Sequence, residues 1–268
     1  MTRPSSRPEA TPSTDSRLVC GYQPVREAIR AHTQKIRKLF VEHKHMLSPK
    51  LKELVSLAVS HGIPIEQIPR SRMDQMGKGI QTQGVIAYAP PFSFLSLEAI
   101  DSLLTTPLVI LDELEDPQNF GAAIRSAVAL GSPTVIWPEH YSAPLSPTTF
   151  RASAGAIEHA RLCRVPNLPH ALTQLQAQGI TVIGLDTHGE LPLERALPTS
   201  RNPIAVVAGA EGKGLRKSVK RACSKTAYLT MQGPLASLNV SVALAIALYE
   251  IARARSPSPL PVPFESLH

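Results

Sequence analysis

Two stretches in the last quarter of the chain hold the residue types that a small-molecule site needs. The first, AVVAGAEGKGLRKS at residues 205–218, reads as a buried strand that runs into a turn with three glycines in six residues, 209–214. Glycines permit positive φ angles and let a ligand approach the backbone closely. The second, SLNVSVALAIALYEIA at 237–252, begins with polar residues and continues as an apolar helix, of which Ser237 is the expected N-cap. A strand that ends in a glycine turn beside such a helix is where α/β proteins bind cofactors.

Two common phosphate-binding motifs are absent from this turn. A P-loop needs Lys-Ser or Lys-Thr after its last glycine, whereas Gly214 is followed by Leu215 and Arg216. A dinucleotide fingerprint needs G-x-G-x-x-G early in a βαβ unit, whereas here the third glycine is missing and the turn lies late in the chain. The residues alone therefore leave the cofactor open.

Charge is distributed unevenly along the chain. Its 268 residues are enough for one large domain or two ordinary ones. Residues 1–90 contain 14 Lys and Arg against seven Asp and Glu, whereas the remaining residues contain 14 of each. The whole excess of +7 therefore lies in the first third. A basic module joined to a neutral one indicates a polyanion-binding part that serves a part that performs chemistry; the alternative is a basic segment kept for solubility.

The three cysteines are far apart and form no C-x-x-C motif, which excludes a zinc knuckle or a disulfide framework and fits a reducing compartment. The histidines show no metal-ligand spacing, so no metal is expected. No apolar run follows the N-terminal arginines, and the longest apolar run is too short to cross a bilayer. We expect a cytoplasmic protein with no membrane partner.

The first third is expected to form a small α/β domain at 17–89, between a Pro-, Ser- and Thr-rich disordered tail at 1–16 and a linker at 90–104 that begins with two prolines. Ser48 and Pro49 predict a helix start, with Ser48 as N-cap and Pro49 at the first position. Order is expected to begin near 18–21, and the other expected elements are strands at 38–42, 63–65 and 84–89 and helices at 23–31 and 72–76.

Residues 105–255 are expected to form the second domain, followed by a tail at 256–268. The continuous apolar run at 107–112 is typical of a parallel strand covered on both faces. Asn119 is the expected N-cap of the helix that follows. Further strands are expected at 134–137, 162–165, 181–185 and 204–208, with helices at 97–104, 147–157, 168–178 and 192–197. This alternation predicts a mainly parallel sheet with helices on both faces.

Three motifs stand in a recognisable order: NFGAAIR at 119–125, GAEGKG at 209–214 and SLNVSV at 237–242. They resemble the three motifs of the SpoU (TrmH) family of RNA ribose 2′-O-methyltransferases over residues 105–255. The basic N-terminal module with its Pro-Pro linker resembles the branch that methylates a guanosine ribose in 23S rRNA, in which a ribosomal-protein-like domain binds substrate. The segment QGVIA at 83–87 is similar to that branch, although Thr82 stands where a histidine is usual.

The resemblance implies a SPOUT-type trefoil-knotted α/β fold, a smaller N-terminal RNA-binding domain and S-adenosyl-L-methionine as cofactor. It also implies a homodimer whose active sites include residues of both subunits, with residues 238–251 forming much of the interface. Carried over by position, the cofactor contacts fall on Gly209, on Leu229 in the last strand and on Leu238. The family usually has Ile-Pro-Met where this chain has Leu229-Thr230-Met231.

The same resemblance assigns the catalytic roles. Arg125 matches the family's essential arginine; because a guanidinium is not deprotonated in proteins, its expected role is to bind a phosphate and stabilise the developing alkoxide. Glu211 is expected to orient substrate or to hold Arg125. Asn119, Ser237 and Asn239 complete the predicted catalytic set, although Ser237 and Asn239 could also serve only as helix-start residues.

The predicted function is methylation of a ribose, expected on a guanosine, in 23S rRNA. Two alternatives stay open: methylation of tRNA or of another rRNA nucleotide, including the antibiotic-resistance type, and a non-catalytic RNA-binding factor of ribosome assembly. The second alternative would be favoured by loss of Asn119, Arg125 or Asn239, and all three are present.

Overall fold

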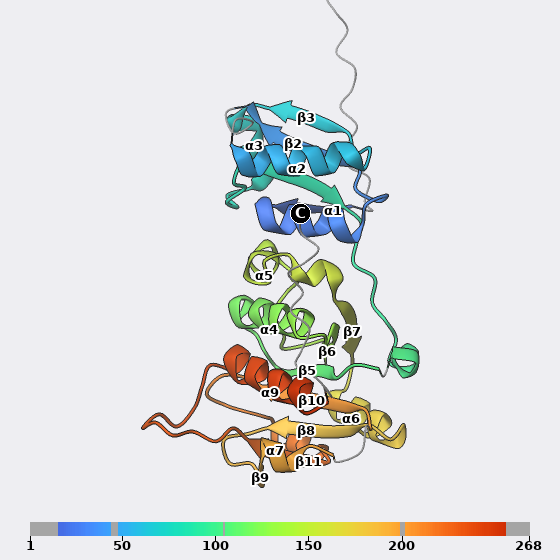
Figure 1. The fold of residues 1–268 in the computed structure, drawn as a ribbon, viewed down its shortest axis with the longest axis vertical. Helices are drawn as coiled ribbons and strands as arrows, with labels where there is room; N and C mark the ends of the chain where they lie inside the picture. The colour runs from blue at the N-terminus through green and yellow to red at the C-terminus, as the bar shows by residue number, and fades with distance from the viewer. Residues whose placement is uncertain (1–15, 44–47, 104, 199–201, 256–268) are drawn as a thin grey trace, which may run out of the picture. The chain divides into compact units, whose positions relative to one another are not determined.

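The structure is a computed structural model that describes residues 16–43, 48–103, 105–198 and 202–255. Its chain divides into two compact units between Phe92 and Ser93, inside the segment expected to be a linker (Figure 1). Apart from Ser16, both expected tails lie outside the described residues.

The N-terminal unit contains a four-stranded sheet in the order β1-β4-β2-β3. The β4 strand runs antiparallel to its neighbours β1 and β2, and β2 pairs with β3 in parallel. The elements are β1 (Arg17–Cys20), α1 (Tyr22–Ala31), β2 (Lys38–Glu42), α2 (Pro49–Ser60), β3 (Ile65–Ile68), α3 (Arg70–Gly77) and β4 (Val85–Ala89).

Helices cover both faces of this sheet because side chains alternate along its strands. Leu39 and Val41 of β2 pack in one core with residues of α1 and α2, whereas Phe40 packs in a second core with Met73 of α3. The predicted start of α2 is confirmed, since Ser48 accepts a hydrogen bond from the backbone N–H of Leu51 and Pro49 is the first helical residue.

The C-terminal unit contains a seven-stranded sheet in the order β7-β6-β5-β10-β8-β11-β9. All of its strand pairs are parallel, so the predicted mainly parallel sheet is confirmed. Its strands are β5 (Leu108–Asp112), β6 (Thr134–Pro138), β7 (Arg161–Val165), β8 (Thr181–Leu185), β9 (Leu191–Pro192), β10 (Ile204–Gly209) and β11 (Lys225–Tyr228).

The helices of this unit lie on both faces of the sheet (Figure 1). One core joins alternate strand residues such as Leu108 and Val207 to residues of α6 and α8, while α4 and α9 pack against each other and against β6 and β10. The helices are η2 (Glu98–Leu103), α4 (Pro117–Ala129), α5 (Pro147–Ala152), η3 (Ala156–His159), α6 (Leu168–Ala177), α7 (Leu193–Ala196), α8 (Lys217–Arg221) and α9 (Val240–Arg255), of which η2 and η3 are 3-10 helices.

Three sequence-based predictions of elements are wrong in their boundaries. The helix expected at 147–157 is broken after α5, because Ala154 and Gly155 adopt φ angles of 50° and 82°. The strand expected at 63–65 runs instead from Ile65 to Ile68. The last strand pairs only as far as Tyr228, so Leu229 follows it directly and is not part of it.

Candidate functional site

The glycine turn lies at the carboxyl end of β10, near the middle of the sheet. It closes on itself through a bridge between Ala210 and Gly214, whose backbone N–H donates to the Ala210 carbonyl at 2.8 Å. Gly212 and Gly214 adopt φ angles of 76° and 66°, which side-chain-bearing residues rarely adopt. A Cβ atom on Gly209 would lie 2.3 Å from the carbonyl carbon and oxygen of Gly214. Glycine is therefore required at 209 for close approach and at 212 and 214 for backbone conformation.

A chain of side-chain hydrogen bonds joins this turn to two helix starts. Asn119 on α4 donates from Nδ2 to Oε2 of Glu211 at 3.0 Å. Asn239, directly before α9, donates from Nδ2 to Oδ1 of Asn119 at 2.8 Å. Ser241 donates to Oδ1 of Asn239 from both its backbone N–H, at 3.0 Å, and its hydroxyl, at 2.7 Å. We call the chain Ser241, Asn239, Asn119 and Glu211 the amide relay.

The chemistry of the two ends fixes the direction of every bond in the amide relay. The backbone N–H of Ser241 can only donate, so the Asn239 atom that faces it must be the amide oxygen. The amide nitrogen of Asn239 then faces Asn119, whose own nitrogen is left to face Glu211. An ionised carboxylate only accepts, so the relay ends there without conflict. These hydrogen bonds hold residues of all three motifs, which are far apart in the sequence, in one fixed arrangement.

The predicted N-caps Asn119 and Ser237 are both wrong. The N-cap of α4 is Asp116, whose carboxylate accepts from the backbone N–H groups of Gln118 and Asn119, with Pro117 at the first position. The first turn of α9 is capped by Asn239, whose carbonyl accepts from Ala243 and whose side chain accepts from Ser241. Capping by Asp116 frees the side chain of Asn119 for the relay, whereas Asn239 has both roles.

Other predicted site residues lie near the relay without joining it. The side chain of Ser237 is exposed and makes no hydrogen bond to the residues that the structure describes. Leu238 is half-buried and precedes Asn239 directly. Half-buried Leu229 lies just beyond β11, two strands from β10 in the same parallel sheet, so it and Gly209 share the carboxyl edge.

Arg125 is exposed on α4 and has no hydrogen bond or ion pair to any described residue. It follows Asn119 by six positions, which places it roughly 9 Å further along the helix and about 120° around the axis. Glu211 bonds to Asn119 instead, so within this chain the carboxylate does not hold the arginine. The structure thus brings together Asn119, Glu211 and Asn239 but leaves Arg125 apart.

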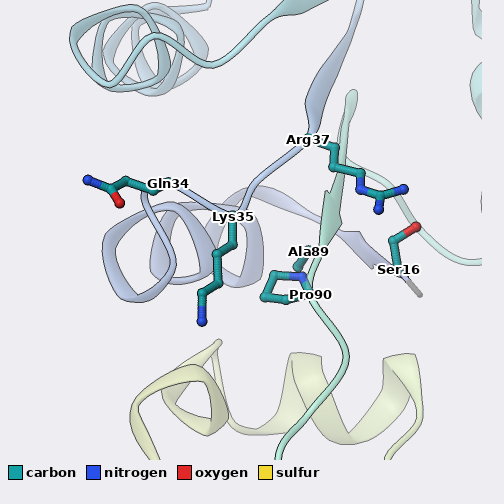
Figure 2. Close-up of a pocket in the computed structure, with 6 residues that line it drawn as sticks. All are labelled: Ser16, Gln34, Lys35, Arg37, Ala89 and Pro90. Carbon is teal, nitrogen blue, oxygen red and sulfur yellow. The ribbon is translucent and has the colours of Figure 1, made fainter. Parts of the chain in front are cut away.

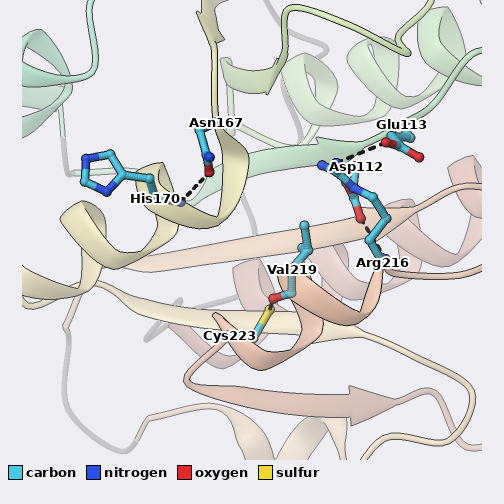
Figure 3. A network of polar contacts seen from close by, with 7 residues as sticks. All are labelled: Asp112, Glu113, Asn167, His170, Arg216, Val219 and Cys223. Atoms are coloured by element: carbon cyan, nitrogen blue, oxygen red, sulfur yellow. Dashed lines mark hydrogen bonds and ion pairs between the residues drawn. The ribbon is translucent and has the colours of Figure 1, made fainter.

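Two residues at this edge were missed by sequence reasoning (Figure 3). Asp112, the last residue of β5, has a fully buried side chain. Arg216 donates to it from the backbone N–H at 2.9 Å and from Nε at 2.7 Å, and its Nη1 lies 3.0 Å from Glu113. A carboxylate that directly ends a continuous apolar strand is the one sequence signal that could have indicated this pair.

Thiolate chemistry is disfavoured in this chain. Burial raises the pKa of Cys20 and of Cys163 to about 11, with a smaller contribution from Glu98 at Cys163. Burial, followed by the charge of Asp112, raises the pKa of Cys223 to about 12. All three thiols are therefore protonated at neutral pH and poor nucleophiles. Among the described residues no cluster of three or more His, Cys, Asp or Glu could hold a metal ion.

The N-terminal unit contains a hollow of about 300 Å³ at the end of its sheet (Figure 2). Lys35 and Arg37, in the turn between α1 and β2, line it together with Ser16, Gln34, Ala89 and Pro90. Nearby, Lys38 pairs with Glu66 at 2.8 Å, as does Arg72. In the described part of the chain, no helix is long and apolar enough to cross a membrane.

Two family models match the chain, one for each unit. The SpoU rRNA methylase family matches residues 106–249, and the RNA 2′-O ribose methyltransferase substrate-binding domain matches residues 18–95. The predicted resemblance to the SpoU family and the predicted N-terminal substrate-binding domain are therefore confirmed.

Relatives and solved structures agree with these matches. An uncharacterised tRNA/rRNA methyltransferase of Mycobacterium ulcerans is 36% identical over 240 residues, covering 88% of this chain and 76% of the relative. The putative TrmH family tRNA/rRNA methyltransferase YacO of Bacillus subtilis is 35% identical, covering 84% and 90%. The crystal structure of the SpoU methyltransferase AviRb from Streptomyces viridochromogenes, in complex with the cofactor AdoMet, is similar with a TM-score of 0.72 and 26% identity, covering 90% and 91%. The chain belongs to the SpoU rRNA methylase family.

Proposed function

We propose that this protein transfers a methyl group from S-adenosyl-L-methionine to a ribose 2′-hydroxyl, on a guanosine of 23S rRNA. The observation that carries the proposal is the amide relay, because it orients residues of all three motifs around the glycine turn. A match of residues 18–95 to a substrate-binding domain of RNA 2′-O ribose methyltransferases supports the ribose hydroxyl as the target.

The residues at the carboxyl edge fit the proposed cofactor. The turn offers exposed backbone between Gly209 and Gly214, and glycine there keeps side chains out of the space beside it. Leu238 and Leu229, both half-buried, would supply apolar contacts and backbone groups. S-adenosyl-L-methionine, when bound, supplies an electrophilic methyl group.

The protein's own residues would position the ribose hydroxyl and stabilise the negative charge that develops on its oxygen. Oε2 of Glu211 is held by Asn119, while its other carboxylate oxygen makes no bond to the described residues and is free to accept from a ribose hydroxyl. Arg125 would bind the neighbouring phosphate and stabilise the alkoxide as the proton leaves to that phosphate or to water. A guanidinium remains charged in this role and does not act as the base.

We propose further that two copies of the chain assemble so that Arg125 of one faces the amide relay of the other. The separation of Arg125 from Asn119 on α4 supports this arrangement, because Arg125 contacts no residue of the amide relay in its own chain. The α9 helix also leaves an apolar face uncovered, since Val242, Ile246 and Tyr249 are 46%, 39% and 49% exposed at helical spacing. A homodimer interface on α9 would cover these side chains.

The decisive experiment is methyl transfer from labelled S-adenosyl-L-methionine to unmodified 23S rRNA and, in parallel, to unmodified tRNA. Nuclease digestion then identifies the labelled nucleoside. We expect label in 2′-O-methylguanosine from rRNA alone. Label in tRNA, or in another rRNA nucleoside, would keep the chemistry and overturn the proposed substrate. Absence of label with RNA still bound would indicate a non-catalytic assembly factor.

An Arg125→Ala variant tests the catalytic assignment. Because this side chain is exposed and unpaired among the described residues, its removal should leave the fold intact. We expect activity to fall at least 100-fold while RNA is still bound. Unchanged activity would remove Arg125 from the mechanism.

A further inference from the structure

Asp112 and Arg216 form a buried link between two segments that are 104 residues apart in the chain. The Asp112 side chain is fully buried, and the Arg216 side chain is 35% exposed. One carboxylate oxygen accepts from the backbone N–H of Arg216, and the other accepts from its Nε. Nη2 also lies 2.7 Å from Oδ1, an ion-pair contact without hydrogen-bond alignment.

Both ends of the glycine turn meet at Asp112. At one end, Gly209 is the register partner of Asp112 in the pairing of β10 with β5. At the other end, Arg216 is bound by the Asp112 carboxylate, two residues after Gly214. The backbone of Gly214 and Leu215 is pressed against Gly209, close enough to exclude a Cβ atom. One residue therefore closes the loop of residues 210–215 at its base.

The guanidinium of Arg216 contacts two carboxylates inside this link. Its Nη1 contacts Glu113, which adopts a φ of 52°, an uncommon angle for a residue other than glycine. The carboxylates of Asp112 and Glu113 both contact this cation (Figure 3), so Arg216 is not available as a phosphate ligand. Arg216 can therefore affect cofactor binding only through the conformation of the glycine turn.

We propose that Asp112 and Arg216 are a positioning pair that holds the glycine turn in its cofactor-binding conformation. This rests on the proposed use of S-adenosyl-L-methionine and adds residues that lie outside the three motifs. The pair touches no reacting atom, so its loss changes cofactor affinity and leaves RNA affinity unchanged. Because a buried carboxylate left without its partner is costly, removing Arg216 alone perturbs the turn more than removing both charges.

The test compares Arg216→Met, Asp112→Asn and the double variant with Lys220→Met. Lys220 of α8 forms an ion pair with Asp186 at 2.9 Å, so its loss removes a similar link in the same region without touching the turn. Calorimetry gives the Kd for S-adenosyl-L-methionine, filter binding gives the Kd for rRNA, and circular dichroism checks the fold.

We expect Arg216→Met to raise the Kd for the cofactor at least tenfold and to leave the Kd for rRNA within twofold of the wild-type value. Lys220→Met should leave both Kd values within twofold of the wild type. In steady state, KM for the cofactor should rise more than kcat falls. The double variant should bind cofactor no more weakly than Arg216→Met. If Arg216→Met does not fold, the cofactor affinity of Asp112→Asn is compared with that of the wild type instead. We then expect Asp112→Asn to bind the cofactor at least threefold more weakly.

A folded Arg216→Met, or in its absence Asp112→Asn, with cofactor affinity equal to the wild type would overturn the proposal. A parallel loss of rRNA affinity would also overturn it, because the role would then be structural. If the wild type itself binds no S-adenosyl-L-methionine, the proposed cofactor fails, and this proposal fails with it.

Discussion

Replacing Asn119 by aspartate tests the amide relay at its centre. Asn119 accepts from Asn239 through Oδ1 and donates to Glu211 through Nδ2. Asn119→Asp keeps the size of the side chain and the acceptor for Asn239. It converts the donor into a second carboxylate oxygen, 3.0 Å from Oε2 of Glu211. The substitution therefore changes only the contact with Glu211, where a repulsion between two carboxylates replaces the hydrogen bond.

The magnitude follows from the geometry of that link. Loss of a hydrogen bond to a charged group costs about 1.5–3 kcal/mol, and the lower value applies because Glu211 is exposed. Two like charges 3 Å apart in water add about 1.4 kcal/mol, an upper limit since the Glu211 side chain can turn toward solvent. At 1.36 kcal/mol for each factor of ten, kcat/KM should fall about 10- to 100-fold.

The assay is transfer of labelled methyl groups to the rRNA substrate under single-turnover conditions. The informative control is the double variant Asn119→Asp/Glu211→Gln, which places a carboxylate at 119 and an amide donor at 211. This arrangement restores the hydrogen bond with its direction reversed and removes the repulsion. We expect it to recover activity to within about threefold of Glu211→Gln alone. Wild-type activity in Asn119→Asp, or no recovery in the double variant, would refute the relay as a positioning device.

Three further predictions concern the turn, the assembly and the RNA. Gly209→Ala should weaken cofactor binding at least tenfold and reduce the free energy of unfolding by about 1–3 kcal/mol, because its Cβ meets backbone that cannot turn away; calorimetry and urea unfolding measure both. Ile246→Asp should give a monomer in light scattering with unchanged unfolding, since the side chain is 39% exposed in the single chain. The pair Lys35→Ala and Arg37→Ala should weaken rRNA binding and lower the slope of log Kd against log salt by about 1.5, if each cation of the hollow contacts one phosphate.

Two of these predictions have a matched comparison within the chain. Gly131 has a φ of 76° with open space around it, so Gly131→Ala should cost about 1 kcal/mol and spare cofactor binding. Exposed Lys50 and Lys52 on α2 carry the same charges away from the hollow, and their replacement should change the salt slope less. Equal slopes for the two pairs would show that the hollow has no special role. A dimer that survives Ile246→Asp would remove α9 from the proposed interface.

The sequence alone determined the class of fold and the family. The continuous apolar run of β5 and the alternation of strands and helices led to a parallel sheet, because such signals are local and need only a few neighbouring residues. The three motifs led to the SpoU family, which the family models confirm. The trefoil knot stays a prediction, because no local pattern specifies how a chain is threaded.

Tertiary structure decided how the motif residues are used. Sequence made Asn119 and Ser237 helix caps, since their types suit that role, but Asp116 and Asn239 hold those positions. Asn119 is free to join Asn239 and Glu211 only because the β10 turn and the starts of α4 and α9 meet at one edge. The pairing of Asp112 with Arg216 spans 104 residues, and its register with Gly209 follows from which strands are neighbours. Such contacts depend on strand order, which composition, periodicity and spacing do not encode.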